Sequence, residues 1–444
     1  MKVGRSIMEN IILKYGGVTT ANSENIKKIA ENIASHTTPN SNIFVVVSAP
    51  GSVDSAQKKV TDILIDLHAD LTQKNDISQN WKLFSQRFME IAKTFQIEKF
   101  TNAILNKIKQ SILEKNNYDF TLSRGEFLTA KMLAKITKSQ FIDAKNVLFF
   151  SEEELDFEKS KKALDLLVAK SKHHLFVVPG FYATANEAIK IFTRDGSDYS
   201  GSLLALVCNA SIYKNIKDVN GLMSANPRII EKPKQVYKIS YKNLNLLTSN
   251  GAKILHSSTI KPLMKTSTKL YICNLFQDKK PTIAIKENIK TKNGFVSLTG
   301  KTNLILATIE KKQNYLSQLA QAFDIFGEMN LTLVNLIYEN EEILLLFEKQ
   351  NFKIISLLDV YDNNFYIKEH ISQITLVGIN FDKNVIKKIT NALEKNFIYP
   401  IHITTTDNLS CIKILVEEKY YEKACLSIYN AFYKKFWFFD FKLK

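Results

Sequence analysis

The sequence predicts an α/β protein in which a mostly parallel, helix-covered sheet is followed by two small ferredoxin-like modules. Three observations lead to this prediction: short apolar runs typical of buried strands, helical repeats between them, and a different order of strands and helices after a polar connector. The connector is the Lys- and Asn-rich stretch 281–294. Because the pattern changes there, we expect the chain to divide near this point.

The apolar runs before the connector are short, rich in β-branched and aromatic residues, and apolar on both faces, as central strands of a parallel sheet are. They occupy residues 10–15, 42–49, 174–181 and 269–276. Between them, residues 60–67 and 103–112 place apolar side chains at the i, i+3, i+4, i+7 spacing of a helix. In such alternating α/β folds, ligands bind at the carboxyl ends of the strands.

The stretch after the connector contains two passes of one order: strand, helix, strand, strand, helix. The first pass has strands in NLILATIE, NLTLVNLIYE and EEILLLFE, with a helix near 313–328. The second has strands in QITLVGIN, YPIHITTT and SCIKILVEE, with helices near 384–395 and 420–434. This is the order of a ferredoxin-like module, and a tandem pair is more often a regulatory or dimerisation unit than a catalytic one.

Length and composition limit the class of protein. A chain of 444 residues exceeds the ~250–300 residues of a single core, so two or three domains are expected. The net charge of +16 is spread along the whole chain, which argues against a nucleic-acid interface. Neither a membrane-spanning run nor a signal peptide is predicted, so we expect a cytoplasmic protein.

Arginine and cysteine are both informative. Only five of the 60 basic residues are arginine, at positions 5, 87, 124, 194 and 228. Since this chain uses lysine wherever a lysine would serve, a remaining arginine indicates a place that needs a planar, bidentate donor. The four cysteines include no C-x-x-C pair, so neither a disulfide framework nor a metal site is predicted.

The first candidate motif is LKYGGVTTAN, residues 13–22, in which a strand ends before a helix that begins near Ser23. The glycine pair Gly16 and Gly17 could present free backbone N–H groups to a phosphate, and Lys14 would add a full positive charge. The stretch matches neither the Walker A pattern nor G-x-G-x-x-G. An ordinary tight turn therefore stays open as the alternative.

Two further motifs offer groups for a small polar substrate. Ser48 ends a strand and Thr61 lies at the start of a helix, so either hydroxyl could bind a substrate carboxylate or could simply cap a turn or helix. Glu126, in LSRGEFLTAKMLA (122–134), could bind an ammonium group or could only complement the dipole of its own helix.

The stretch IFTRDGSDYSGSLLAL, residues 191–206, places three charged and four small residues ahead of an apolar helix. Arg194, Ser197 and Asp198 are its candidate functional residues, and a capped turn is the alternative. Two more motifs follow: IKDVNGLMSANPRII (216–230), with two tight turns, and NGAKILHSSTIKP (250–262), with His256, for which we expect a structural role.

The order of these motifs resembles the aspartate kinase family. KYGG, VVVSAPG with VTD downstream, SRGE, VVPGF, TRDGSDYSG, KDVNG followed by ANPR, and GAKILH occur in that order across nearly the whole chain. The residues within these motifs are similar to those of the monofunctional enzymes of low-GC bacteria. The resemblance implies a three-layer amino-acid kinase domain at 1–288 and two βαββαβ ACT domains at 295–370 and 371–444. Completion of the first ACT domain by the C-terminal strand stays open as an alternative.

The resemblance also implies the reaction: phosphoryl transfer from ATP, with Mg²⁺, to the side-chain carboxylate of L-aspartate. This step leads toward lysine, threonine, methionine and diaminopimelate. It assigns Lys14, Gly16 and Gly17 to the ATP phosphates, and Asp198 to the substrate ammonium or to the orientation of Lys14. Aspartate would be held by Ser48, Thr61, Glu126, Arg194 and Ser197. The positions that would line the nucleotide are Lys217, Asp218, Met223, Arg228 and Lys253.

Departures from the family pattern keep two rival interpretations open. Asp195 stands where a glycine is usual, and Val18, Ile216, Lys217, Met223 and Asn226 also differ. One rival is another kinase of this fold, and the other is a non-catalytic regulatory relative. The ACT modules imply a homodimer or a dimer of dimers and a lysine or threonine effector, although TTTDNLSC (404–411) replaces the usual effector-loop run, so dimerisation is the firmer expectation.

Overall fold

The computed structural model describes residues 8–54, 57–193, 196–287, 289, 294–311, 315–328, 331–348, 366–379, 381, 384–406 and 410–433. The chain folds into two compact units. The first contains the chain up to Leu222 with Gln235–Thr248 and Lys253–Asn288. The second contains Met223–Lys234, Ser249–Ala252 and the chain from Ile289 onward.

The first unit is built on an eight-stranded sheet with the order β10-β12-β11-β9-β1-β2-β6-β3. All its strand pairs are parallel except β11 with β12. This confirms the mostly parallel sheet that the apolar runs predict. The bounds are β1 (Glu9–Tyr15), β2 (Ser41–Val47), β3 (Gln140–Phe141), β6 (Leu175–Pro179), β9 (Ile212–Lys217), β10 (Lys238–Ser240), β11 (Lys269–Asn274) and β12 (Thr282–Ile285).

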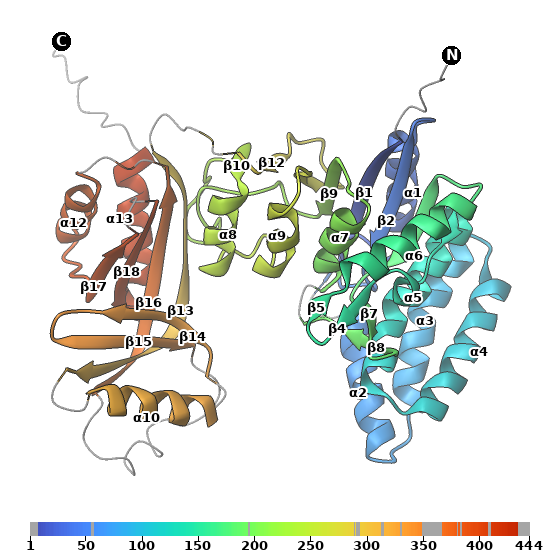
Figure 1. Ribbon diagram of the computed structural model, residues 1–444, viewed down its shortest axis with the longest axis horizontal. Coiled ribbons are helices and arrows are strands. Elements are labelled where there is room, and N and C mark those ends of the chain that lie inside the picture. Colours follow the sequence, from blue (N-terminus) through green and yellow to red (C-terminus); the bar gives the residue numbers. More distant parts are fainter. Residues whose placement is uncertain are drawn as a thin grey trace. The chain divides into compact units, whose positions relative to one another are not determined.

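Helices cover both faces of this sheet (Figure 1). Ile11, Leu13 and Tyr15 of β1 pack in one core with the first five helices, while the intervening Ile12 is equally buried and points to the other face. Helix α7 packs on β1, β2 and β9. The bounds are α1 (Ser23–His36), α2 (Val60–Thr72), α3 (Ser78–Thr94), α4 (Glu98–Lys115), α5 (Tyr118–Thr137), α6 (Phe157–Lys170), α7 (Gly196–Val207), α8 (Tyr241–Ser249) and α9 (Ser257–Met264).

The first unit also contains a small four-stranded sheet, which the sequence patterns do not predict. Its order is β5-β4-β7-β8, with β4 (Phe149–Ser151), β5 (Glu154–Leu155), β7 (Tyr182–Ala185) and β8 (Ala188–Ile191). Strands of two to four residues are too short to show a repeat. The hairpin β7–β8 leads directly into the stretch before α7.

The second unit contains one six-stranded sheet with the order β14-β15-β13-β16-β18-β17. The two predicted modules share it, because the long strands β13 and β16 pair antiparallel at its centre. The bounds are β13 (Phe295–Glu310), α10 (Tyr315–Glu328), β14 (Leu333–Tyr338), β15 (Glu342–Glu348), β16 (Tyr366–Gly378), α12 (Val385–Glu394), β17 (His402–Thr405), β18 (Cys411–Glu417) and α13 (Tyr421–Tyr433). The predicted last strand falls in 434–444, outside the described residues.

A helix can cross a membrane only when it has about 20 residues that are predominantly apolar. Within the residues that the structure describes, none of the helices combines the length and the apolar character that a membrane span requires.

Candidate active site

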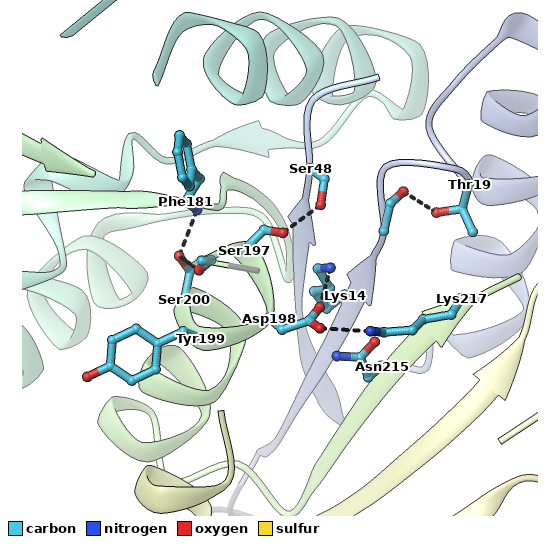
Figure 2. Close-up of polar contacts among 12 residues, drawn as sticks. Lys14, Thr19, Ser48, Phe181, Ser197, Asp198, Tyr199, Ser200, Asn215 and Lys217 are labelled. Carbon is cyan, nitrogen blue, oxygen red and sulfur yellow. Dashed lines mark hydrogen bonds and ion pairs between the residues drawn. The ribbon is translucent and has the colours of Figure 1, made fainter. Parts of the chain in front are cut away.

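A cavity of about 150 Å³ lies at the carboxyl ends of β1, β2 and β9, the place where a parallel sheet is expected to bind ligands. The N-terminus of α7 closes one side, and Figure 2 shows side chains from all four elements pointing toward one another. The lining residues are Lys14, Gly16, Gly17, Val18, Thr19, Ser48, Ser197, Asp198, Lys217 and Asp218. Eight of these ten are residues that the sequence analysis assigns to substrate or nucleotide.

The centre of the cavity is a carboxylate between two lysines. Lys14 Nζ pairs with one oxygen of Asp198, and Lys217 Nζ lies 2.9 Å from the other. Lys217 also donates to the backbone oxygen of Ile254 at 2.8 Å, so its ammonium group is held from two directions. Lys14 and Asp198 are almost completely buried. The carboxylate therefore fixes the position of two positive charges that come from different strands.

The electrostatics of Asp198 follow from this geometry. Burial disfavours its charged form, yet the ammonium groups of Lys14 and Lys217 outweigh burial and hold the pKa of Asp198 well below its usual range. The group is thus ionised at neutral pH. Within this cluster two ammonium groups and one carboxylate leave one positive charge, which suits an anionic ligand. Asp218, which is exposed, adds a second carboxylate to the lining of the cavity.

Helix α7 begins with the small residues that the sequence analysis singled out. Ser197 Oγ lies 2.6 Å from Ser48 Oγ, which links the helix to the end of β2. Ser200 Oγ accepts from the backbone N–H of Phe181 at 2.8 Å, so the helix start is also tied to the turn after β6. Gly201 is required by close packing, because a Cβ there would lie 2.7 Å from the hydroxyl oxygen of Tyr213. That hydroxyl donates to the backbone oxygen of Asp198 at 2.9 Å.

The turn after β1 is stabilised by threonines that the sequence analysis missed. Thr19 lines the cavity, and its hydroxyl donates to the backbone oxygen of Gly16 at 2.6 Å. Thr20 Oγ1 lies 3.1 Å from the backbone oxygen of Ala49 in the neighbouring turn. The signal is present in the sequence, since Thr19 and Thr20 follow the glycine pair after one residue, and hydroxyl side chains often stabilise turns by hydrogen bonds to the backbone.

Glu126 is a buried acid on α5, 5% exposed, and it does not line the cavity itself. Burial raises its pKa from 4.5 to about 7, against the lowering effects of the Ala49 backbone N–H, Lys14 and Arg124. Among the described residues its Oε2 atom has no hydrogen-bond partner. An unsatisfied buried carboxyl oxygen with a raised pKa is typical of a functional group that awaits a charged partner.

The remaining predicted residues lie elsewhere. Thr61 is half-buried in the first turn of α2, and Lys253 is exposed just before Ile254. Met223 and Arg228 belong to the segment Met223–Lys234 of the second unit, where Arg228 is exposed. Arg194 lies outside the described residues, as does Asp195, so the structure gives no position for either.

His256 has the structural role that the sequence analysis expects. It is the N-cap residue of α9, and its Nδ1 atom accepts from the backbone N–H of Ser258 at 3.3 Å. It is exposed and does not line the cavity.

The fold and the site together define a class of phosphate-handling α/β proteins, in which lysines and a glycine turn meet at the carboxyl ends of parallel strands. The chain belongs to the amino acid kinase family, whose model matches residues 9–274. Within that family its relatives include aspartokinases. It is 28% identical to the aspartokinase of Rickettsia felis over 96% of this chain and 99% of the relative. It is also 25% identical to the bifunctional aspartokinase/homoserine dehydrogenase of Buchnera aphidicola, of which it spans 56%.

The chain is also similar to solved structures of aspartate kinases. The aspartate kinase of Clostridium acetobutylicum matches with a TM-score of 0.85 and 29% identity, over 95% of this chain and 100% of that one. Escherichia coli aspartokinase III, solved in complex with aspartate and ADP, matches with a TM-score of 0.77 and 18% identity over 96% and 100% of the two chains. The likeness at 18% identity supports the fold alone. Both matches cover the two units, and the Clostridium acetobutylicum enzyme does so at higher identity.

Proposed function

We propose that this protein is an ATP-dependent aspartate kinase that phosphorylates the side-chain carboxylate of L-aspartate. The observation that carries the proposal is the buried Lys14–Asp198–Lys217 arrangement, which holds surplus positive charge beside Ser48 and Ser197. Its relatives of matching length, such as the one from Rickettsia felis, are named aspartokinases. A non-catalytic relative would not need to keep Lys14 buried on an ionised carboxylate, so the site favours the enzyme. Lys217, at a position that departs from the family pattern, adds a second positive charge.

The chemistry needs no general base, because a carboxylate acceptor is already ionised at pH 7. Catalysis then depends on holding the two reactants in line and on neutralising the charge that spreads over the transferred phosphoryl group. Among the described residues that line the cavity, none is histidine or cysteine. Lysines and backbone N–H groups are the groups this reaction requires.

On the nucleotide side, Lys14 with Gly16 and Gly17 would hold the phosphates, and Lys217 would add a second positive charge from the next strand. The N-terminus of α7 points the positive end of a twelve-residue helix at the same cavity. The other positions proposed to contact the nucleotide are Asp218, Met223, Arg228 and Lys253.

Mg²⁺ is proposed as an ion that arrives with ATP. Asp198 is occupied by two lysines, and Asp218 is the exposed carboxylate at the cavity. In the part of the chain that the structure describes, no group of three or more His, Cys, Asp or Glu side chains could hold a metal. This donor set fits an ion held mainly by phosphate oxygens and water, with Asp218 as the protein group that could reach it. When bound, Mg²⁺ would neutralise charge on the phosphates.

On the acceptor side, Ser48, Ser197 and Thr61 would donate to carboxylate oxygens, and Arg194 would clamp the substrate's other carboxylate with its planar fork. Glu126 is proposed to bind the substrate ammonium group. Its raised pKa supports this role, because an ammonium group at its unpartnered oxygen would favour the ionised form. Asp198, which contacts both lysines, is proposed to orient them rather than to bind the substrate.

The domain boundaries 1–288, 295–370 and 371–444 remain a proposal, and so does the role of the C-terminal modules. We assign to the second unit the pairing of subunits into a homodimer or a dimer of dimers, with lysine or threonine as a possible effector. A relative of the same fold was solved with lysine and aspartate bound, the T-state of E. coli aspartokinase III.

A hydroxamate assay tests the function. The purified protein is incubated with ATP, Mg²⁺, L-aspartate and hydroxylamine, which converts an acyl phosphate to a hydroxamate that is detected as its coloured ferric complex; parallel reactions contain glutamate or acetylglutamate. Product from aspartate is expected. Product from another acceptor alone would assign the protein to a different kinase of this fold, and a folded protein with no product from any acceptor would reject the enzymatic proposal.

The variant Arg194→Lys tests the acceptor site within the same assay. A lysine keeps the charge but cannot donate two parallel hydrogen bonds. The KM for aspartate should rise by roughly tenfold, the effect of losing about 1.4 kcal/mol of binding, while the KM for ATP serves as the internal control and stays unchanged. Wild-type behaviour for both substrates would show that Arg194 does not hold the carboxylate.

A further inference from the structure

Arg87 is one of the five arginines, and no motif of the sequence analysis includes it. It lies on α3, and its side chain is buried, with the residue 8% exposed. Its guanidinium donates to three backbone oxygens: to Gly51 at 2.8 Å, to Ala21 at 3.1 Å and to Lys58 at 3.4 Å. A buried arginine that binds main-chain oxygens instead of water has a positional role.

These three oxygens belong to the two loops that border the candidate active site. Ala21 ends the turn between β1 and α1, which contains Gly16, Gly17 and Thr19. Gly51 and Lys58 lie near the two ends of the segment between β2 and α2, which starts at Ser48 and leads to Thr61. One side chain therefore contacts the loop proposed for the nucleotide and both ends of the loop proposed for the acceptor.

The two loops also touch each other directly. The backbone N–H of Gly51 donates to the oxygen of Gly17 at 2.8 Å, and the Thr20 hydroxyl contacts the Ala49 oxygen at 3.1 Å. Their main chains approach so closely that a Cβ on Gly51 would lie 2.7 Å from the carbonyl carbon of Gly17. The approach is backbone to backbone, so a displacement of one loop would disturb the other, and Arg87 donates to a backbone oxygen of each.

We infer that Arg87 is a positioning residue that couples the nucleotide loop to the acceptor loop, so that both substrates depend on one guanidinium which touches neither. The inference rests on the proposed function for the identity of the two substrates. Nη2 donates to both Ala21 and Gly51, and Nη1 donates to Lys58, so the rigid plane of the guanidinium fixes all three contacts at once. A lysine is a poorer replacement, because its ammonium group lies on a flexible stem and lacks the second nitrogen. This explains why a chain with so few arginines retains one here.

The test compares Arg87→Lys with wild type for both substrates in turn. A displacement of the loops by about 1 Å should lower kcat/KM by ~10- to 100-fold, and by a similar factor whether ATP or aspartate is varied. Phe88→Leu is the matched control, because Phe88 is fully buried on the same helix but takes no part in these hydrogen bonds. It should lower the Tm while kcat/KM stays within twofold of wild type.

A second variant alters the contact between the two loops and leaves Arg87 unchanged. Gly51→Ala forces the two main chains apart and should reproduce the paired loss of kcat/KM for ATP and aspartate, even if Arg87→Lys proves too unstable to assay. The inference is overturned if Arg87→Lys keeps wild-type constants, if only one substrate is affected, or if Phe88→Leu reduces kcat/KM as much at an equal loss of Tm.

A binding measurement separates this inference from the proposed function. Calorimetric titration with Mg-ATP needs no turnover, and Arg87→Lys should bind it at least about tenfold more weakly than wild type. If the wild type binds Mg-ATP but does not phosphorylate aspartate, the proposed function fails while the positioning role of Arg87 is still decided by this comparison. Equal affinities in the two proteins would reject the positioning role.

Discussion

The substitution Asp198→Asn changes one atom at the centre of the site and removes the charge that holds both lysines. Lys217 Nζ lies 2.9 Å from the carboxylate, which corresponds to about 6 kcal/mol of Coulomb attraction at an effective dielectric constant of 20, before desolvation is subtracted. Removing one partner from a buried ion pair typically costs ~3–5 kcal/mol. We therefore expect a Tm at least ~6 °C lower than in the wild type.

The kinetic signature of Asp198→Asn should be a split between binding and turnover. The loss of a negative charge leaves two lysines near the phosphates, so the KM for ATP should stay equal or fall. The turnover number should drop by ~10²-fold or more, because the carboxylate that orients both ammonium groups is lost, and Lys217 keeps only its hydrogen bond to the Ile254 oxygen. Steady-state hydroxamate kinetics and thermal unfolding measure the two effects. A kcat within threefold of wild type, or a raised KM for ATP with unchanged kcat, would refute the orienting role.

Two other predictions concern buried positions. Because the pKa of Glu126 is raised from 4.5 to about 7, ionising it destabilises the folded protein. Without aspartate, the free energy of unfolding of the wild type should fall by roughly 3 kcal/mol between pH 4.5 and pH 8 because of this group. Glu126→Gln should abolish that fall in urea unfolding at pH 4.5 and pH 8; identical pH dependence in the two proteins would contradict it. Gly201→Ala should lower the Tm, since overpacking against Tyr213 costs ~1–3 kcal/mol. Gly327→Ala on α10 has nothing within 4 Å and should not lower it, whereas equal Tm values for these two variants would count against the packing argument.

Much of the fold follows from local patterns. The strands at 10–15 and 42–49 are almost entirely buried on both faces, as their continuous apolar runs predict. The same expectation is wrong for the run 269–276, because only Leu270 and Ile272 of β11 are buried. The order of strands and helices after residue 294 agrees with the described elements of the second unit. Two features have no local signal in the sequence. One is the small sheet of β4, β5, β7 and β8, and the other is the antiparallel pairing of β13 with β16 that joins two modules into one sheet. Both depend on contacts between distant segments.

The residues of the site likewise divide into those that local sequence patterns identify and those that only the folded structure brings together. Lys14, Ser48 and Ser197 stand at strand ends or at a helix start, positions that sequence patterns can identify, and the cavity brings them together. The contact of Asp198 with Lys217 joins residues from two different elements, and the support of both loops by Arg87 spans 66 residues to Ala21. Side chains that act across such distances in the chain have no motif. The roles of the substrate-contacting residues, Arg194 above all, stay predictions.

Transfer of an oxygen atom tests the central claim most directly. If the aspartate side-chain carboxylate attacks the γ-phosphate, that carboxylate supplies the bridging oxygen of the acyl phosphate, and hydroxylamine then releases phosphate with this oxygen attached. With aspartate labelled in its side-chain carboxylate with ¹⁸O, the account predicts one ¹⁸O atom in each phosphate released, observed by ³¹P NMR. Phosphate that contains no ¹⁸O would show that water, and not aspartate, accepts the phosphoryl group, and would contradict the account.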